Sequence, residues 1–134
     1  MSQNTEPIFP QGQKAPADYF TGNAWVKNLV APEDGLNATA GNVFFEPEAR
    51  NNWHTHSGGQ ILIVTDGKGY YQEKGKAAQL IQKGDVVKIP ADVVHWHGAS
   101  HESSLTHIAI NPNIQKGIVQ WMEKVTDEEY NSLQ

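Results

Sequence analysis

Short apolar segments separated by glycine and proline turns dominate the hydrophobic pattern of this chain. Most of these segments are rich in β-branched and aromatic residues, which favour strands, and a clear helical signal comes only near the C-terminus. This pattern predicts an all-β protein, either a sandwich or a jelly-roll barrel. The strands are expected over residues 24–30, 38–45, 60–65, 69–73, 78–82, 86–89 and 105–111.

The turns between these segments also predict how the strands connect. Asp66 and Gly67 end the segment over residues 60–65, so we expect residues 69–73 to fold back on it as a hairpin. Residues 117–125 fit a strand and a helix equally well. Thr126 and Glu129 have the spacing of a capping box, which predicts a short C-terminal helix.

The N-terminal stretch differs from the rest of the chain. Residues 1–18 are polar, lack periodicity and contain Pro7, Pro10 and Pro16. We interpret them as an irregular arm, strapped across the domain or onto a partner subunit. Residues 19–134 are then expected to form a single domain, because a chain of 134 residues suits one modest core.

Composition and charge exclude several function classes. The formal net charge is −5 and no basic patch stands out, so we expect no nucleic-acid partner and no anionic membrane surface. The chain has no cysteine, which excludes disulfides, thiolate nucleophiles and cysteine-based zinc sites. No signal peptide or apolar spanning segment is evident, and we therefore expect a cytoplasmic protein.

Histidines occur in two pairs with the same spacing, His54 with His56 and His95 with His97. A strand directs alternate side chains to one face, so both members of each pair are expected to point the same way. Imidazole is a common ligand for transition metals, and an amide oxygen is a weaker one. The pattern predicts a metal site with one or two positions left for water or substrate. Its ligands would be His54, His56, Gln60 and His95.

Two alternatives remain open for these residues. Histidines can simply be scattered through a core or over a surface, although their concentration on strand-like segments argues against this. Gln60 is neutral where a carboxylate would lower the charge of the site, so a divalent metal would keep its +2 charge. That favours Lewis-acid chemistry over metal-centred redox chemistry, unless glutamine is a substitution of little consequence.

Further residues are candidates for the reaction itself. His97 would crowd the metal as an additional ligand, so we expect it to act as a general acid and base. His107 lies on another predicted strand and would either share this role or be an ordinary core histidine. Asn51, Asn111 and Phe45 are candidate walls of a substrate pocket.

The strand pattern also bears on assembly. If Gln60 and His107 face inward, the neighbouring aliphatic residues of the same strands face outward and need a cover. A homodimer or homotetramer would supply it, and the N-terminal arm is the alternative. The outward residues are expected to be Ile61, Ile63, Ile108 and Ile110.

These residues resemble the two signatures of the cupin family. The glutamate that usually follows the first histidine pair is replaced by Gln60, and Asp92 stands where cupins often have glycine. From about residue 20 to about residue 130, the chain is similar to small bacterial single-domain cupins. These include manganese-dependent hydroxynitrile lyases and cupins labelled as carboxymuconolactone decarboxylase-related. The matching signature residues are His54, His56, Gln60 and Gly67, then Gly84, Pro90 and His95.

The resemblance implies a jelly-roll barrel that holds one divalent metal ion per chain and forms even-numbered oligomers. It implies manganese as the first candidate for this metal, while iron, nickel, cobalt and zinc also suit the donors. It assigns proton transfer to His97 and His107 in a lyase that cleaves a carbon–carbon bond of a small hydroxy or carbonyl compound. Asn51 stands for a hydroxyl residue of these lyases and Asn111 for a glutamine. The alternatives are an iron-dependent dioxygenase and a non-enzymatic cupin that binds a metal or ligand.

Overall fold

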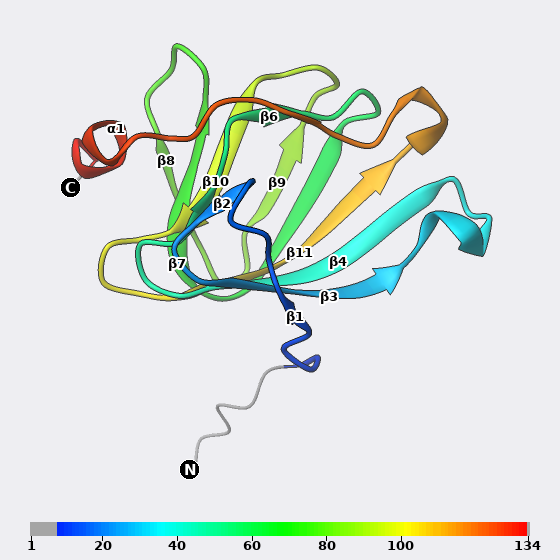
Figure 1. Ribbon diagram of the computed structural model, residues 1–134, viewed down its shortest axis with the longest axis horizontal. Coiled ribbons are helices and arrows are strands. Elements are labelled where there is room, and N and C mark those ends of the chain that lie inside the picture. Colours follow the sequence, from blue (N-terminus) through cyan, green and yellow to red (C-terminus); the bar gives the residue numbers. More distant parts are fainter. Residues whose placement is uncertain (1–7, 134) are drawn as a thin grey trace.

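The computed structural model describes residues 8–133, and strands form most of the regular structure in this range (Figure 1). The expected all-β jelly-roll barrel with a short C-terminal helix is confirmed. No helix in the described range is long and apolar enough to cross a membrane. The elements are β1 Gln13–Lys14, β2 Phe20–Thr21, β3 Ala24–Val30, η1 Pro32–Asp34, β4 Ala38–Phe45, β5 Arg50–Asn51, β6 His54–Thr55, β7 Gln60–Glu73, β8 Gln79–Gln82, β9 Val86–Ile89, β10 His95–Ala99, β11 Leu105–Pro112, η2 Ile114–Lys116, β12 Gln120–Trp121 and α1 Asp127–Asn131.

The strands pair antiparallel along the path β1-β3-β4-β11-β7-β10-β5-β2, and the sheet curls so that its two halves face each other. Figure 1 shows β3, β4 and β11 side by side along one wall. The first half of β7 pairs with β9 and β11, and its second half pairs with β8 and β10. The long strand β7 therefore joins the two halves of the barrel.

The continuity of β7 contradicts the expected hairpin at Asp66 and Gly67. Both flanking segments are strands, but they form one strand of 14 residues and do not pair with each other. Gly67 has φ of +79°, a conformation that suits glycine, and the ladder to β11 shifts register between Thr106 and His107. The Ser104 backbone also lies so close that a Cβ at Gly67 would clash with it. The glycine therefore bends the strand from one sheet half into the other.

The hydrophobic pattern did not predict several short strands. β2, β5 and β6 have two residues each, which is too short for an alternation to appear. In the expected arm, β1 pairs with Trp25 and Val26 of β3, whereas residues 1–7 lie outside the described residues. The ambiguous segment over residues 117–125 contains β12, which pairs with His54 and Thr55.

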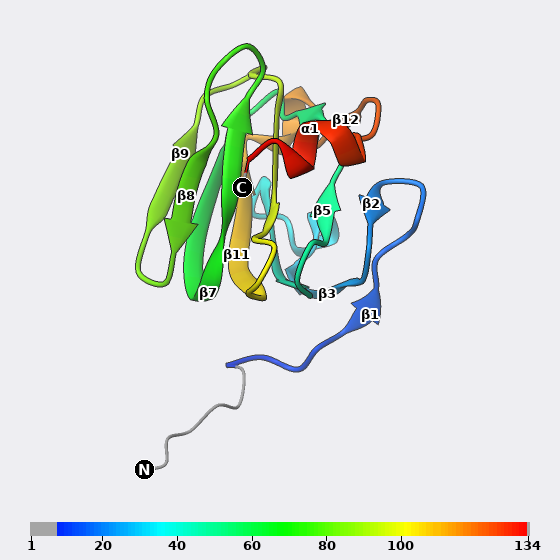
Figure 2. The same cartoon turned by 90° about the vertical axis from the view of Figure 1, so that its left-hand side faces the viewer.

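The predicted capping box at the C-terminal helix is confirmed. The Thr126 hydroxyl accepts from the Glu129 amide at 3.0 Å, and the Glu129 carboxylate accepts from the Thr126 amide at 2.9 Å. The helix lies outside the barrel near β5 (Figure 2). Its Tyr130 is fully buried and donates its hydroxyl to the Ala99 carbonyl at 2.6 Å. Arg50 of β5 holds the first turn through Asp127 at 2.7 Å.

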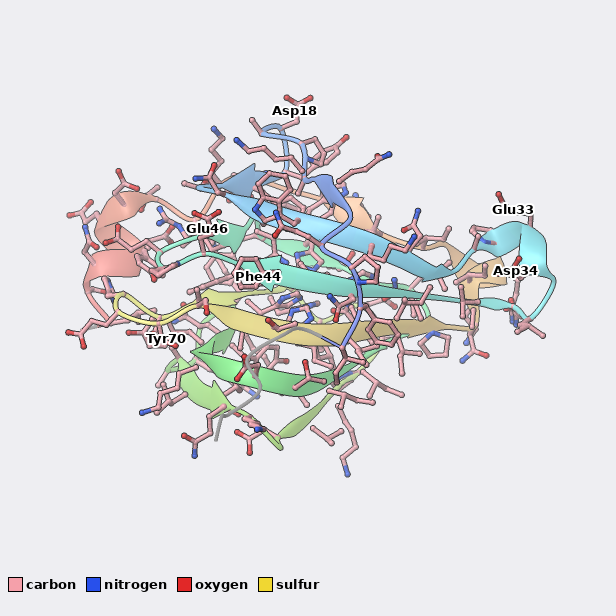
Figure 3. All side chains as sticks on the ribbon, turned by 90° about the horizontal axis from the view of Figure 1, so that it is seen from below. Asp18, Glu33, Asp34, Phe44, Glu46 and Tyr70 are labelled. Carbon is pink, nitrogen blue, oxygen red and sulfur yellow. The ribbon has the colours of Figure 1, made fainter. Side chains whose placement is uncertain are left out.

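The main core lies inside the barrel between the two sheet halves. It follows from alternation, because Gln60, Leu62 and Val64 of β7 are buried while Ile61 and Ile63 are only half-buried. On β4, Phe45 is likewise fully buried, whereas Phe44 lies on the outer face of the wall (Figure 3). The apolar core occupies part of the barrel, and the rest of the interior holds histidines.

Candidate metal centre

Five of the six histidines converge inside the barrel and are at most 5% exposed. His54 comes from β6, His56 directly follows it, His95 and His97 come from β10, and His107 comes from β11. The sixth, His101, is half-buried near the C-terminal helix and bonds to Tyr70 and Asn131. The two predicted histidine pairs and His107 thus share one interior.

Strand pairing brings the imidazoles together. His95 lies opposite His54 where β10 pairs with β6, and their ring centroids are 4.3 Å apart. His56 lies beyond the end of β6. His54 and His56 therefore do not lie on one strand, contrary to the expectation from the sequence. Its ring nevertheless lies 4.9 Å from that of His54 and 5.6 Å from that of His95.

Three of these imidazoles bond to backbone carbonyls, and we call them the carbonyl-bound histidines: His54, His56 and His95. Each uses Nδ1 for this bond. A carbonyl oxygen only accepts, so Nδ1 of each neutral ring carries the proton and Nε2 presents a lone pair. The bonds run from His54 to Asn52 at 2.7 Å, from His56 to Ile118 at 2.6 Å and from His95 to Val93 at 2.9 Å.

Gln60 adds a fourth acceptor to this set. Its amide nitrogen donates to Asn111 Oδ1 at 3.1 Å, which turns its oxygen inward to 3.2 Å from His95 Nε2. Since His95 Nε2 carries no proton, two lone pairs face each other there. His56 Nε2 is also buried and has no hydrogen-bond partner among residues 8–133. Several acceptors without donors are the arrangement that a cation satisfies, so these residues fit a divalent metal ion.

The other two histidines are bonded differently, and we call His97 and His107 the histidine pair. His107 Nε2 lies 3.0 Å from His97 Nδ1. The Asn51 amide nitrogen lies 3.2 and 3.3 Å from the two ring nitrogens of His97, and its oxygen accepts from the His97 backbone amide at 3.0 Å. In the described part of the chain, neither ring nitrogen of His97 bonds to a backbone carbonyl.

Distance alone does not select the metal ligands. One nitrogen from each of His54, His95 and His97 lies within 4.8 Å of the others, so this three-histidine group could also hold a metal ion. The rings of His56 and His97 lie at similar distances from that of His95, 5.6 and 5.7 Å. Hydrogen bonding distinguishes the two rings: in the described range His56 Nε2 is buried without a partner, while His97 already bonds to Asn51 and His107.

Burial keeps all five imidazoles neutral at neutral pH. Loss of solvation lowers the pKa of His54 and His97 well below 6.5, and the neighbouring imidazoles lower it further. Burial also lowers the pKa of His56, and it lowers the pKa of His95 and of His107 to about 4. Neutral imidazoles are the form that binds metals and accepts protons.

A cavity of about 370 Å³ reaches this cluster. All three predicted pocket residues, Phe45, Asn51 and Asn111, line it, and so does His97. His107 does not line it but lies behind His97, against the Phe45 ring at 5.3 Å. None of the lining residues is charged within the part of the chain that the structure describes.

Some lining residues were not predicted from the sequence. Thr39 and Val43 have the same parity as Phe45 on β4, so strand alternation alone could have found them. Ile118 and Trp121 fall in the segment whose structure the sequence left open, and no local signal points to them.

Residues 41–111 match the cupin domain family. The chain belongs to the cupin family. This cupin is 45% identical over 117 residues to an (R)-mandelonitrile lyase from Granulicella tundricola, which covers 87% of this chain and 89% of that protein. The expected resemblance to small single-domain cupins is therefore confirmed.

Solved structures agree with this family. A cupin-like protein from Thermotoga maritima is 53% identical, with a TM-score of 0.93, over 96% of this cupin and 97% of that chain. The polyketide cyclase RemF from Streptomyces resistomycificus has a TM-score of 0.64 at 12% identity, over 98% of this cupin and 92% of that chain. The second similarity concerns the fold alone.

Proposed function

We propose that this cupin is a metal-dependent lyase that cleaves a carbon–carbon bond in a small neutral hydroxynitrile. The observation that carries the proposal is that both sites reach one cavity, the first through His54, His56 and Gln60 and the second through His97. Four acceptors suited to a cation lie beside a histidine pair suited to proton transfer. The similarity to a mandelonitrile lyase supports the same reaction class.

The carbonyl-bound histidines and Gln60 would hold one divalent cation, with manganese the first candidate. When bound, the cation supplies Lewis-acid stabilisation of the negative charge that develops on the substrate oxygen. Gln60 contributes no charge of its own, so a bound divalent cation would keep its formal charge of +2. The Nδ1 bonds to Asn52, Ile118 and Val93 keep the three rings oriented for this task.

His97 is the proposed base. When it donates Nδ1–H to Nε2 of His107, its own Nε2 has a lone pair that accepts from the Asn51 amide at 3.3 Å, and the substrate hydroxyl would replace that bond. This lone pair takes the hydroxyl proton of the substrate. As the carbon–carbon bond breaks, its electron pair leaves with cyanide, and the C–O bond becomes the carbonyl of an aldehyde.

The same histidine completes the cycle. The His97 imidazolium gives its proton to cyanide, which leaves as hydrogen cyanide, and the imidazole becomes neutral again. One hydroxynitrile thus yields one aldehyde and one hydrogen cyanide. His107 supports the step by accepting the hydrogen bond from His97 Nδ1, which stabilises the transient positive charge.

The lining of the cavity supports a neutral substrate. A carboxylate would need a cationic side chain, and the described lining includes neither lysine nor arginine. Phe45, Ile118 and Trp121 offer apolar surface for the aldehyde part of the substrate. Mandelonitrile is therefore the first compound to test.

The test compares three proteins on (R)-mandelonitrile, with release of benzaldehyde as the readout and a reaction without protein as the blank. Chelator-treated protein is expected to be inactive, and reloading with manganese is expected to restore activity. The manganese-loaded His97→Ala variant should keep its metal and lose activity. Full activity in the metal-free protein or in His97→Ala would overturn the proposal.

The two rival functions give different results in the same experiment. An iron-dependent dioxygenase would consume oxygen when loaded with iron, whereas the proposed lyase needs none. A non-enzymatic cupin would turn over no hydroxynitrile with any of the five metals.

We also propose a homodimer or homotetramer that covers the half-buried Ile61, Ile63, Ile108 and Ile110, which analytical ultracentrifugation would test.

A further inference from the structure

An amide ligand has a difficulty that a carboxylate ligand does not have. The side chain of Gln60 ends in an oxygen and an NH₂ group of similar shape, and only the oxygen can bind a cation. Rotation by half a turn would place the NH₂ group beside His95 Nε2, where it would form a good hydrogen bond in the metal-free site. Something must therefore favour the orientation in which the oxygen faces the imidazoles.

Two hydrogen bonds from neighbouring strands favour that orientation. Gln60 Nε2 donates to Asn111 Oδ1 at 3.1 Å, and Asn111 Nδ2 donates to Thr39 Oγ1 at 3.0 Å. The residues lie on β7, β11 and β4, and Asn111 is directly opposite Thr39 in the ladder between β11 and β4. All three side chains line the cavity.

These two hydrogen bonds couple the orientations of the Asn111 and Gln60 amides. In this arrangement the Thr39 oxygen accepts from the NH₂ group of Asn111, and the Asn111 oxygen faces Gln60. A hydroxyl both donates and accepts, so Thr39 supports this orientation of Asn111 without enforcing it. Because the Asn111 oxygen can only accept, it takes the NH₂ group of Gln60 and leaves the Gln60 oxygen facing His95 at 3.2 Å. With Asn111 in this orientation, turning Gln60 alone would set two amide oxygens against each other.

We propose that Asn111 is a positioning residue that orients the Gln60 amide and thereby sets the affinity of the site for a divalent cation. The inference rests on the ligand set of the proposed function. It gives Asn111 a role in holding the metal ligand, in addition to forming part of the pocket wall. It also explains how glutamine can serve in place of a carboxylate, since a carboxylate presents an oxygen in either orientation.

A double-mutant cycle tests this role. The dissociation constant for Mn²⁺ is measured by titration calorimetry on the metal-free full chain, the Asn111→Ala variant, the Gln60→Glu variant and the double variant. Asn111→Ala is expected to weaken Mn²⁺ binding by about tenfold to a hundredfold when residue 60 is glutamine. The same change should alter affinity less than about twofold when residue 60 is glutamate, because the carboxylate needs no orientation.

Two further variants separate orientation from general damage. Thr39→Val removes the hydroxyl but keeps the side-chain shape, and it should weaken Mn²⁺ binding less than Asn111→Ala does, whereas Thr39→Ser should bind Mn²⁺ normally. Asn28→Ala removes another asparagine that lines the cavity, and its Mn²⁺ affinity should be unchanged. A similar loss in both residue-60 backgrounds, or no loss in either, would overturn the inference.

The cycle also distinguishes this inference from the proposed function. If the protein shows the expected pattern of Mn²⁺ affinities but cleaves no hydroxynitrile, the lyase proposal fails and the role of Asn111 stands. If the unaltered protein binds no divalent cation, both proposals are overturned.

Discussion

Among residues 8–133, the imidazoles of His54, His56 and His95 each donate Nδ1–H to a backbone carbonyl, whereas the imidazole of His97 bonds only to the side chains of Asn51 and His107. All five imidazoles are buried to a similar degree, so burial does not divide them. A bond to a carbonyl permits one tautomer, because the oxygen cannot donate. A bond between two imidazoles permits two, because the proton can reside on either ring. The first arrangement suits a fixed metal ligand and the second suits proton transfer.

The largest expected effect comes from removing a carbonyl-bound histidine. His54→Ala deletes the ring whose centroid lies 4.3 Å from that of His95 and 4.9 Å from that of His56. We expect metal content to fall to background and lyase activity with it, a loss well beyond the roughly tenfold to hundredfold that follows when a residue bonded to a metal ligand is changed. Elemental analysis after loading with manganese measures this. A His54→Ala protein with one tightly bound metal ion would exclude His54 from the ligand set.

The matching change in the histidine pair should separate metal binding from turnover. His97→Ala is expected to keep the Mn²⁺ affinity within about threefold and to lower kcat by about 10²- to 10⁴-fold, the usual contribution of a general acid or base. Calorimetry and benzaldehyde release measure the two quantities on the same preparation. If His97→Ala loses its metal instead, His97 is a ligand and the two groups are not distinct.

The third expected effect concerns the stability of the metal-free protein at different pH values. The pKa of His107 is about 4 in the folded state and near 6.5 when unfolded, so the unfolded chain binds more protons in this interval. The stabilisation is fully present above pH 6.5 and is lost as the pH falls toward 4, by up to about 3 kcal/mol for this one group. Urea unfolding across this range measures how the free energy of unfolding changes with pH. His107→Phe should reduce the number of protons taken up on unfolding by up to one.

Ring carbon chemical shifts of His107 give a second measurement of the same prediction. They should stay at the neutral value down to about pH 5, well below the point at which an exposed histidine such as one in an unfolded peptide titrates. Half-protonation of His107 near pH 6.5 would contradict the shift, and so would an unchanged slope in His107→Phe.

The smallest effect is expected from a site remote from both groups. Thr126→Ala removes the hydroxyl that caps α1, at a cost of about 1 kcal/mol in the free energy of unfolding. Because the helix lies outside the barrel, Mn²⁺ affinity and kcat should not change. This variant calibrates the comparison: a large loss of metal in Thr126→Ala would mean that general destabilisation, not loss of a ligand, explains a similar result in His54→Ala.

Much of the barrel could be predicted because strands have a period of two. Alternation on the segment from Gln60 correctly set Leu62 and Val64 inward, and the capping-box spacing correctly located the C-terminal helix. The hairpin at Gly67 was wrong because an Asp-Gly pair suits both a reversal and a bend. Which of them forms depends on the partners of β7, and these are strands distant in the sequence.

The sequence alone was enough to predict a histidine-rich interior, because two i, i+2 histidine pairs and His107 fall on or beside segments with strand character. What each imidazole can do depends on contacts that form only in the folded chain. Its tautomer depends on the hydrogen-bond partner of its other nitrogen, and such partners come from anywhere in the chain. The carbonyl that orients His56 belongs to Ile118, 62 residues away, in a segment without a clear pattern. The bond between His97 and His107 likewise exists because β10 and β11 both pair with β7.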